Sequence, residues 1–198
     1  MKIHKDIIQG TPEWLALRKG KLTASHAQEI GNCGKGLDTY IMEVLAGEYS
    51  SGEVDFFSNK DMARGTELEP SARAIYELEN GCVIEQVGFI EYNEFIGCSP
   101  DGLEGEDGGD EIKCHNDVTH FKMILNGEKE IESKYIWQIQ MNLLITGRKY
   151  WNYIAYNPNF EKSLLVFKIL PDPEKHARLL EGFALGESKI KAIKAKIN

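Results

Sequence analysis

The spacing of hydrophobic positions is helical over the first 80 residues. Thr11-Pro12 opens a helix that Gly20 ends, because threonine caps helix N-termini and proline fits the first turn. A loop is predicted over 47–59, where small and polar residues dominate. Further helices are predicted at 23–31 (capped by Thr23 and ended by Gly31), at 37–45, and at 59–80, with Gly65 and Pro70 disturbing the first half of the last one and Gly81 ending it.

From residue 83 the pattern shortens to the two-residue period of strands. Short strands separated by turns are predicted at 83–92, 95–100 and 110–114, with an acidic turn at 104–110. Helical spacing returns at 119–125 and 133–146, two more strands follow at 150–156 and 164–170, and a long helix begins at Pro171. This order predicts an α/β (α+β) fold with a central mixed β-sheet flanked by helices.

Composition excludes several classes of protein. The chain has 198 residues, 42% of them hydrophobic, which is enough for one domain with a full core. Its net charge of −8 argues against a protein that only coats nucleic acid, but not against a nuclease whose acids bind metal. We see no secretory signal and no apolar run near the roughly 18 residues of a membrane span. Four cysteines, none in a C-x-x-C pair, indicate a reducing, cytosolic setting with mostly buried free thiols.

The candidate chemistry lies in two segments, 99–102 and 110–113. Asp101 follows one predicted strand, whereas Glu111 and Lys113 are two residues apart on the next and therefore share a face. A turn between the strands brings Asp101 beside Glu111. Two adjacent carboxylates repel each other unless a cation lies between them, and Mg²⁺ or Mn²⁺ prefers such oxygen ligands.

Other groups complete this arrangement. The carbonyl of Ile112 offers another oxygen, and Lys113 is suited to orient water or to offset charge on a phosphate. Glu67 and Glu69 are candidates for a further acid, although spacing alone does not place them. The alternative is a plain turn at 99–102 and a solvated E-x-K strand, since short motifs often arise by chance. An acid at the end of a buried strand is costly without a partner, which favours the site.

Five segments, in this order, resemble the lambda-exonuclease-like (YqaJ-type) viral recombinase family of the PD-(D/E)xK nuclease superfamily. Any one of these segments is weak evidence, but five in order are specific. They are WLALRKG with TAS (14–20 and 23–25), GTELE (65–69), CSPDGL (98–103), EIKC (111–114) and YIWQIQ (135–140).

The resemblance implies a single nuclease domain over 1–198 with a restriction-endonuclease-like core. Its parts are N-terminal helices over 11–80, a catalytic core over about 66–170 and a C-terminal helix over 172–197. The implied activity is processive 5′→3′ degradation of one strand of double-stranded DNA, which leaves a 3′ single strand for recombination.

Residue roles follow from the resemblance in the same way. It implies two Mg²⁺ ions, with Mn²⁺ able to substitute, held by Glu69, Asp101, Glu111 and the Ile112 carbonyl, with Lys113 and Gln138 acting on the attacking water. It assigns the 5′-terminal phosphate to Arg18, Ser25 and Ser99, and an apolar wedge to Met62. The guanidinium fork of Arg18 suits phosphate oxygens on physical grounds as well.

The resemblance also implies partners: a ring-shaped homotrimer, double-stranded DNA ends, a single-strand annealing protein and no membrane, in the cytoplasm of a bacterial host as a phage or prophage product.

Two other functions stay open. A structure-specific or restriction-type endonuclease would share Asp101, Glu111 and Lys113, and a DNA-end-binding accessory protein would lack catalysis. The basic C-terminal helix fits a DNA path or, as charge runs more often do, a solvated face.

Overall fold

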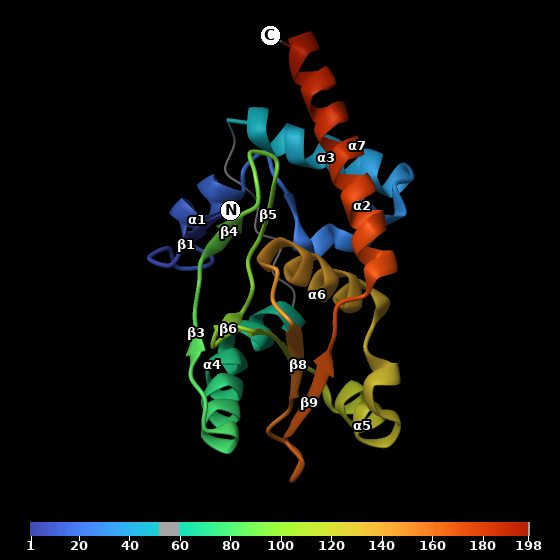
Figure 1. Ribbon diagram of the computed structural model, residues 1–198. Coiled ribbons are helices and arrows are strands. Elements are labelled where there is room, and N and C mark those ends of the chain that lie inside the picture. The colour runs from blue at the N-terminus through green and yellow to red at the C-terminus, as the bar shows by residue number, and fades with distance from the viewer. Residues whose placement is uncertain (52–59, 198) are drawn as a thin grey trace.

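The computed structural model describes residues 1–51 and 60–197, and for residues 60–63 it describes the backbone alone. The helices of the first 80 residues precede a run of five strands, after which helices and strands follow in shorter groups (Figure 1). The helices are α1 (Pro12–Arg18), α2 (Ala27–Asn32), α3 (Lys35–Tyr49), α4 (Lys60–Asn80), α5 (Asp117–Asn126), α6 (Ser133–Thr146) and α7 (Pro173–Ile197), with 3₁₀ turns η1 (Ala24–His26) and η2 (Gly127–Glu130). The strands are β1 (Lys2–His4), β2 (Leu22–Thr23), β3 (Ile84–Glu85), β4 (Phe89–Glu91), β5 (Ile96–Cys98), β6 (Gly102–Glu104), β7 (Gly108–Cys114), β8 (Tyr150–Tyr156) and β9 (Leu164–Ile169).

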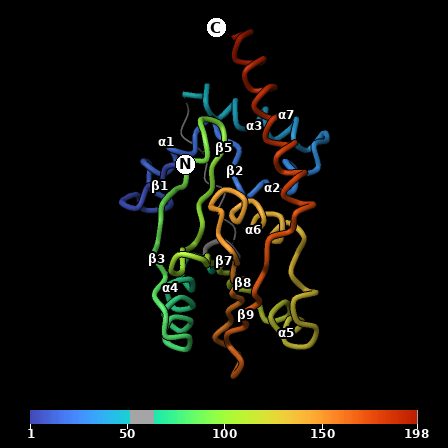
Figure 2. Tube along the Cα trace, in the orientation of Figure 1, coloured from blue at the N-terminus to red at the C-terminus, as the bar shows by residue number. Residues whose placement is uncertain are grey.

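The strands of the described residues form two mixed sheets. The smaller sheet has the order β1-β4-β5-β2, in which only the β5–β2 pair is parallel. The larger sheet has the order β3-β6-β7-β8-β9, in which only the β7–β8 pair is parallel. In Figure 2 the trace runs from β5 in the upper half to β7 in the lower half, so residues 99–101 join one sheet to the other.

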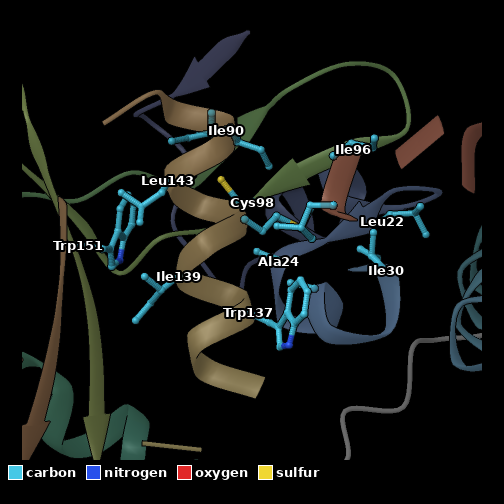
Figure 3. Close-up of a cluster of buried hydrophobic side chains, with 14 of the residues drawn as sticks. Leu22, Ala24, Ile30, Ile90, Ile96, Cys98, Trp137, Ile139, Leu143 and Trp151 are labelled. Atoms are coloured by element: carbon cyan, nitrogen blue, oxygen red, sulfur yellow. The ribbon is translucent and has the colours of Figure 1, made fainter. Parts of the chain in front are cut away.

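Helix α6 lies in the main core between the larger sheet and the N-terminal helices. In Figure 3, Ile139 and Leu143 lie toward Trp151 of β8, whereas Trp137 lies on the side of Ala24 and Ile30. Trp137 is 9% exposed, and each of the other five residues is at most 3% exposed. A helix that is apolar on both sides is held by packing rather than by its own propensity. This packing fixes α6 and therefore any polar side chain that it carries.

A second cluster of buried side chains packs α4 against the larger sheet. Ala72 and Tyr76 of α4 contact Ile112 of β7 and Ile154 of β8. The packing places one end of α4 beside the strand that carries the predicted chemistry. Within the described residues, we find no helix with the length and apolarity that crossing a bilayer requires.

The lysines of α7 are largely engaged with acidic residues. Lys189 bonds Asp38 of α3, Lys194 lies 2.6 Å from Glu48 of α3, and Lys191 lies 3.8 Å from Glu187 of α7 itself. These contacts support the interpretation of the C-terminal helix as a solvated, charge-compensated face rather than a DNA path.

Several predicted elements are confirmed. Helix α6 has the predicted bounds, β8 begins and ends as predicted, and the Thr11 hydroxyl caps α1 by accepting a bond from the Trp14 amide. The sheets and their flanking helices confirm the mixed α/β fold class, although there are two sheets rather than one central sheet.

Other local predictions are wrong. The single strand predicted at 83–92 is divided between β3 and β4, which belong to different sheets. The strands β1, β2 and β6 were not predicted. Helix α4 continues through Pro70, and α3 extends to Tyr49, into the loop predicted at 47–59, of which residues 52–59 lie outside the described residues. The Thr23 hydroxyl does not cap the following turn. All four cysteines are free, but only Cys98 is buried.

Candidate active site

Strand β7 presents Glu111 and Lys113 on one face, as the two-residue period predicts. Lys113 Nζ lies 2.5 Å from Glu111 Oε1, and the amide of Gln138 on α6 donates to the same oxygen at 2.7 Å. Glu111 is fully buried, and its second oxygen, Oε2, has no hydrogen-bond partner within the described residues. A buried, half-satisfied carboxylate beside an ammonium group is expensive to maintain, which marks it as a functional group.

Asp101 is held beside this strand by the β6–β7 hairpin. Gly102 pairs with Asp110, so Asp101 reaches the level of Glu111, and the amide of the next residue on β7, Ile112, donates to Asp101 Oδ2 at 2.7 Å. The amide and carbonyl of one strand residue point to the same edge, so the Ile112 carbonyl also faces Asp101. Gly102 permits the close packing of β3 on β6, because a Cβ there would overlap the side chain of Ile84 on β3.

Glu69 supplies the third carboxylate from α4. It lines the same cleft as Asp101, Ile112 and Lys113, and its Oε1 accepts a bond of 2.5 Å from Arg73, one turn further along the helix. Glu67, the other acid considered from the sequence, is exposed and does not line this cleft. The cleft has a volume of about 600 Å³, and Tyr135 and His115 lie on its walls.

The charges in the cleft are strongly coupled. Burial raises the pKa of Glu111 to about 7; Lys113 opposes this rise and Asp101 adds to it. Burial and the charge of Asp101 also raise the pKa of Glu69, which Arg73 opposes. Burial lowers the pKa of Lys113, but Glu111 and Asp101 more than offset this, so its pKa lies above the ordinary value. The charge of Asp101 therefore hinders the ionisation of Glu69 and Glu111, and a divalent cation between the carboxylates would relieve that repulsion.

The donor set fits a hard divalent cation, although the ligands are not arranged around one. Among the described residues, no three His, Cys, Asp or Glu side chains already converge as metal ligands. The orphaned Oε2 of buried Glu111, the edge-facing carbonyl of Ile112 and the carboxylates of Asp101 and Glu69 are all oxygen donors, the type that Mg²⁺ and Mn²⁺ prefer.

A second polar cluster lies at the start of the connection between the sheets. Arg18 at the end of α1 donates to Ser99 Oγ at 3.1 Å and to Thr23 Oγ1 at 3.2 Å. The hydroxyls of Thr23 and Ser25 are 3.2 Å apart, and Trp14 Nε1 donates to Ser99 Oγ at 2.9 Å. Arg18 also stacks on the Trp14 ring at 4.3 Å. Burial lowers the pKa of Arg18, but the guanidinium remains charged at any physiological pH. Guanidinium and hydroxyl donors gathered in this way are of the type that binds anions.

The sequence of the chain matches a known domain. The family described as the YqaJ-like viral recombinase domain matches residues 13–149, which include both clusters. The chain belongs to this family.

Solved structures agree with the family assignment. An alkaline exonuclease, LHK-Exo from Laribacter hongkongensis, is 32% identical with a TM-score of 0.80, and the match covers 94% of this chain and 98% of that one. The same enzyme in complex with dAMP matches at 33% identity, with the same TM-score and coverage. A phage-related exonuclease from Haemophilus somnus 129PT, 14% identical with a TM-score of 0.67 over 90% of this chain and 96% of that one, shares the fold. No curated protein matches significantly.

The structure brings the predicted residues of this family member together in two groups. Glu69, Asp101, Glu111, Ile112, Lys113 and Gln138 form the cleft group, and Arg18, Ser25 and Ser99 form the anion group. The side chain of Met62, the predicted wedge, lies outside the described residues.

Sequence reasoning missed three residues that hold these groups. Arg73 contacts Glu69, Thr23 links Arg18 to Ser25, and Trp14 holds Ser99. The i, i+4 spacing of Glu69 and Arg73 on a predicted helix was the only available signal among them. Thr23 was instead interpreted as a helix cap, and Trp14 was used only as part of a motif.

Proposed function

We propose that the protein is a Mg²⁺-dependent 5′→3′ exonuclease that degrades one strand of linear double-stranded DNA from 5′-phosphorylated ends and leaves 3′ single strands for phage-type recombination. One observation carries the proposal. An anion site built on Arg18 and a carboxylate site with a lysine are joined by the segment Ser99–Asp101, which contributes one residue to each. Family membership and the alkaline exonuclease relative support the same activity.

The anion site sets the polarity of the reaction. The guanidinium of Arg18, with the hydroxyls of Ser25 and Ser99, binds the 5′-terminal phosphate by charge-assisted hydrogen bonds. Phosphate binding replaces the bond from Arg18 to Ser99 rather than leaving either group without a partner. An end that lacks the phosphate offers no anion to the partly buried guanidinium and is therefore a poorer substrate.

The cleft group carries out hydrolysis. Glu69, Asp101, Glu111 and the Ile112 carbonyl would hold Mg²⁺, two ions in the full site with Mn²⁺ able to substitute. When bound, the metal would polarise the scissile phosphate and lower the pKa of water. Lys113 orients the attacking water and offsets negative charge that develops on the phosphate. Gln138 donates to Glu111 Oε1 at 2.7 Å and helps to position the attacking water.

The wider assembly is part of the proposal. We propose one nuclease domain over the whole chain, assembly into a ring-shaped trimer around DNA, cooperation with a single-strand annealing protein, and action in the cytoplasm of a bacterial host. The relative that was solved with dAMP supports a DNA substrate. Light scattering of the purified protein tests the trimer.

The decisive experiment uses linear duplex DNA labelled at either end, with and without a 5′ phosphate, in Mg²⁺ or EDTA, beside a closed circle. We expect Mg²⁺-dependent loss of nucleotides from 5′ ends, faster with the phosphate, and an intact circle. Cleavage of the circle would reassign the protein as an endonuclease. Binding of ends without hydrolysis in any metal would make it an accessory protein.

A further inference from the structure

Arg73 is largely buried beside the acidic cleft, between α4, the β5–β6 connection and the β3–β4 connection. Its guanidinium bonds Glu69 Oε1 on α4 at 2.5 Å and reaches the main-chain oxygen of Asp101 at 3.4 Å. The amide of Gln86, between β3 and β4, also meets it: turned so that its oxygen faces Arg73, that oxygen accepts bonds of 2.7 and 3.0 Å. The Arg73 side chain is only 11% exposed, whereas that of Glu69 is 35% exposed. The Arg73 guanidinium, which contacts three elements, is therefore far more restrained than the Glu69 carboxylate that it binds.

The bond from Arg73 completes a pattern that all three carboxylates share. Each has one oxygen anchored by the protein: Glu111 Oε1 by Lys113 and Gln138, Asp101 Oδ2 by the Ile112 amide, and Glu69 Oε1 by Arg73. The second oxygen of Glu111 has no partner within the described residues. In the described part of the chain, neither Glu69 nor Asp101 makes a hydrogen bond through its second oxygen. One fixed oxygen and one unengaged oxygen is the arrangement expected of carboxylates that are oriented to bind metal.

The position of Arg73 shows from which side it acts. A second cavity, of about 830 Å³, lies on the side of Arg73 and Gln86, and both residues line it. Glu69 and Asp101 line this cavity and the catalytic cleft, whereas Lys113 and Ile112 line the cleft only. Arg73 therefore contacts the Glu69 carboxylate and the main chain of Asp101 on the side away from Lys113.

We propose that Arg73 is a positioning residue that fixes Glu69, and through its main chain Asp101, so that their second oxygens bind the divalent cation. The inference rests on the metal site of the proposed function. Without Arg73 the half-exposed Glu69 side chain turns toward solvent, and ordering it again opposes metal binding. Loss of partners that orient metal ligands typically lowers metal affinity about 10–100-fold.

The test measures metal binding directly. Free Mn²⁺ is quantified by electron paramagnetic resonance during titration of the wild type and of Arg73→Ala, Arg73→Gln and Arg73→Lys. We expect the Mn²⁺ dissociation constant to rise about 10–100-fold for the alanine and glutamine variants, with partial recovery for lysine, which keeps the charge but lacks the fork. The Mg²⁺ concentration for half-maximal hydrolysis should rise in parallel, while the rate at saturating Mg²⁺ recovers. Arg178→Ala, which removes a comparable arginine bonded to the Gly31 carbonyl at 3.0 Å, is the matched control.

Three results would overturn the inference. Equal or tighter Mn²⁺ binding by folded Arg73 variants would show that the guanidinium repels the cation more than it orients the ligand. A higher KM for DNA with unchanged Mn²⁺ binding would show that Arg73 contacts the substrate instead. Failure of the wild type itself to bind Mn²⁺ would refute the metal site, and with it the proposed function. Circular dichroism confirms folding, and the lysine variant decides the question if the other two do not fold.

Discussion

Replacing Asp110 with asparagine should stabilise the protein at neutral and alkaline pH without slowing DNA hydrolysis. Asp110 is fully buried on β7, next to Glu111 but on the opposite face of the strand. Its Oδ1 accepts a bond of 3.0 Å from Asn152, whereas its Oδ2 has no partner within the described residues. Burial raises the pKa of Asp110 from 3.8 to about 7; the bond from Asn152 opposes this rise, and the charges of Glu104 and Asp101 add to it.

The expected gain in stability follows from the difference between the pKa of Asp110 in the unfolded chain and its pKa in the folded protein. Below about pH 4 the carboxyl is protonated in the folded and unfolded states, so its stabilising contribution is fully present. As pH rises toward 7, only the unfolded chain loses the proton, and stability falls. About 3 pKa units correspond to about 4 kcal/mol, an upper limit; relaxation and water penetration leave about 2 kcal/mol. For a chain of this size, that is a rise in Tm of about 4–8 °C for Asp110→Asn at pH 8.

The assay compares thermal unfolding of the wild type and Asp110→Asn from pH 4.5 to pH 8 in EDTA. The gain in Tm should be largest at pH 8 and shrink toward the acid end. Nuclease rates of Asp110→Asn should match those of the wild type, whereas Glu111→Gln, one residue away on the other face, should be inactive. A gain in Tm that is independent of pH would refute the ionisation argument. Loss of hydrolysis in Asp110→Asn would refute the conclusion that Asp110 lies on the face of β7 away from the active site.

Three further predictions concern the proposed activity. Lys113→Met should lower kcat about 10²–10⁴-fold while binding of DNA ends in Ca²⁺ persists; loss of both in a folded variant would make Lys113 a binding residue. Arg18→Ala should cost about 2 kcal/mol, roughly 30-fold in kcat/KM, on 5′-phosphorylated ends only, and equal losses on both kinds of end would contradict the phosphate site. Mg²⁺ at about 100 times its Kd should stabilise the wild type by about 2.7 kcal/mol, measured as a rise in Tm of about 5–11 °C. Glu111→Gln should lose this Mg²⁺-dependent rise, and a rise of equal size would place the metal elsewhere.

The sequence predicted the elements whose stability depends on long, regular patterns. Helix α6 was predicted with both ends correct because its apolar positions follow one period over 14 residues. The strands β1, β2 and β6 have two or three residues, too few to show a period, and they exist because other strands pair with them. The segment 83–92 looked like one strand because nothing local marks Gln86–Gly88 as the passage between two sheets.

The candidate site was likewise predictable only where it depends on local sequence. The alternation of Glu111 and Lys113 on a strand is a local property, and so is the turn that returns the chain from Asp101. The bond between Arg73 and the Asp101 main chain spans 28 positions, and the contact of Arg18 with Ser99 spans 81. Such pairings arise only when helices and sheets have packed. Pro70 shows the converse, since the packing of Ala72 and Tyr76 keeps α4 continuous through a residue that locally disfavours a helix.

The short connection between β5 and β6 has a consequence for the size of the product. Ser99 and Asp101 are separated by one residue, so their Cα atoms lie at most about 7 Å apart. If Ser99 contacts the terminal phosphate and Asp101 the metal at the next phosphodiester, the backbone itself measures a single nucleotide. The protein should then release mononucleotides from the first turnover onward, with no short oligonucleotides among the early products. Insertion of one glycine after Ser99 would increase the distance between Ser99 and Asp101. The first product should then shift toward dinucleotides.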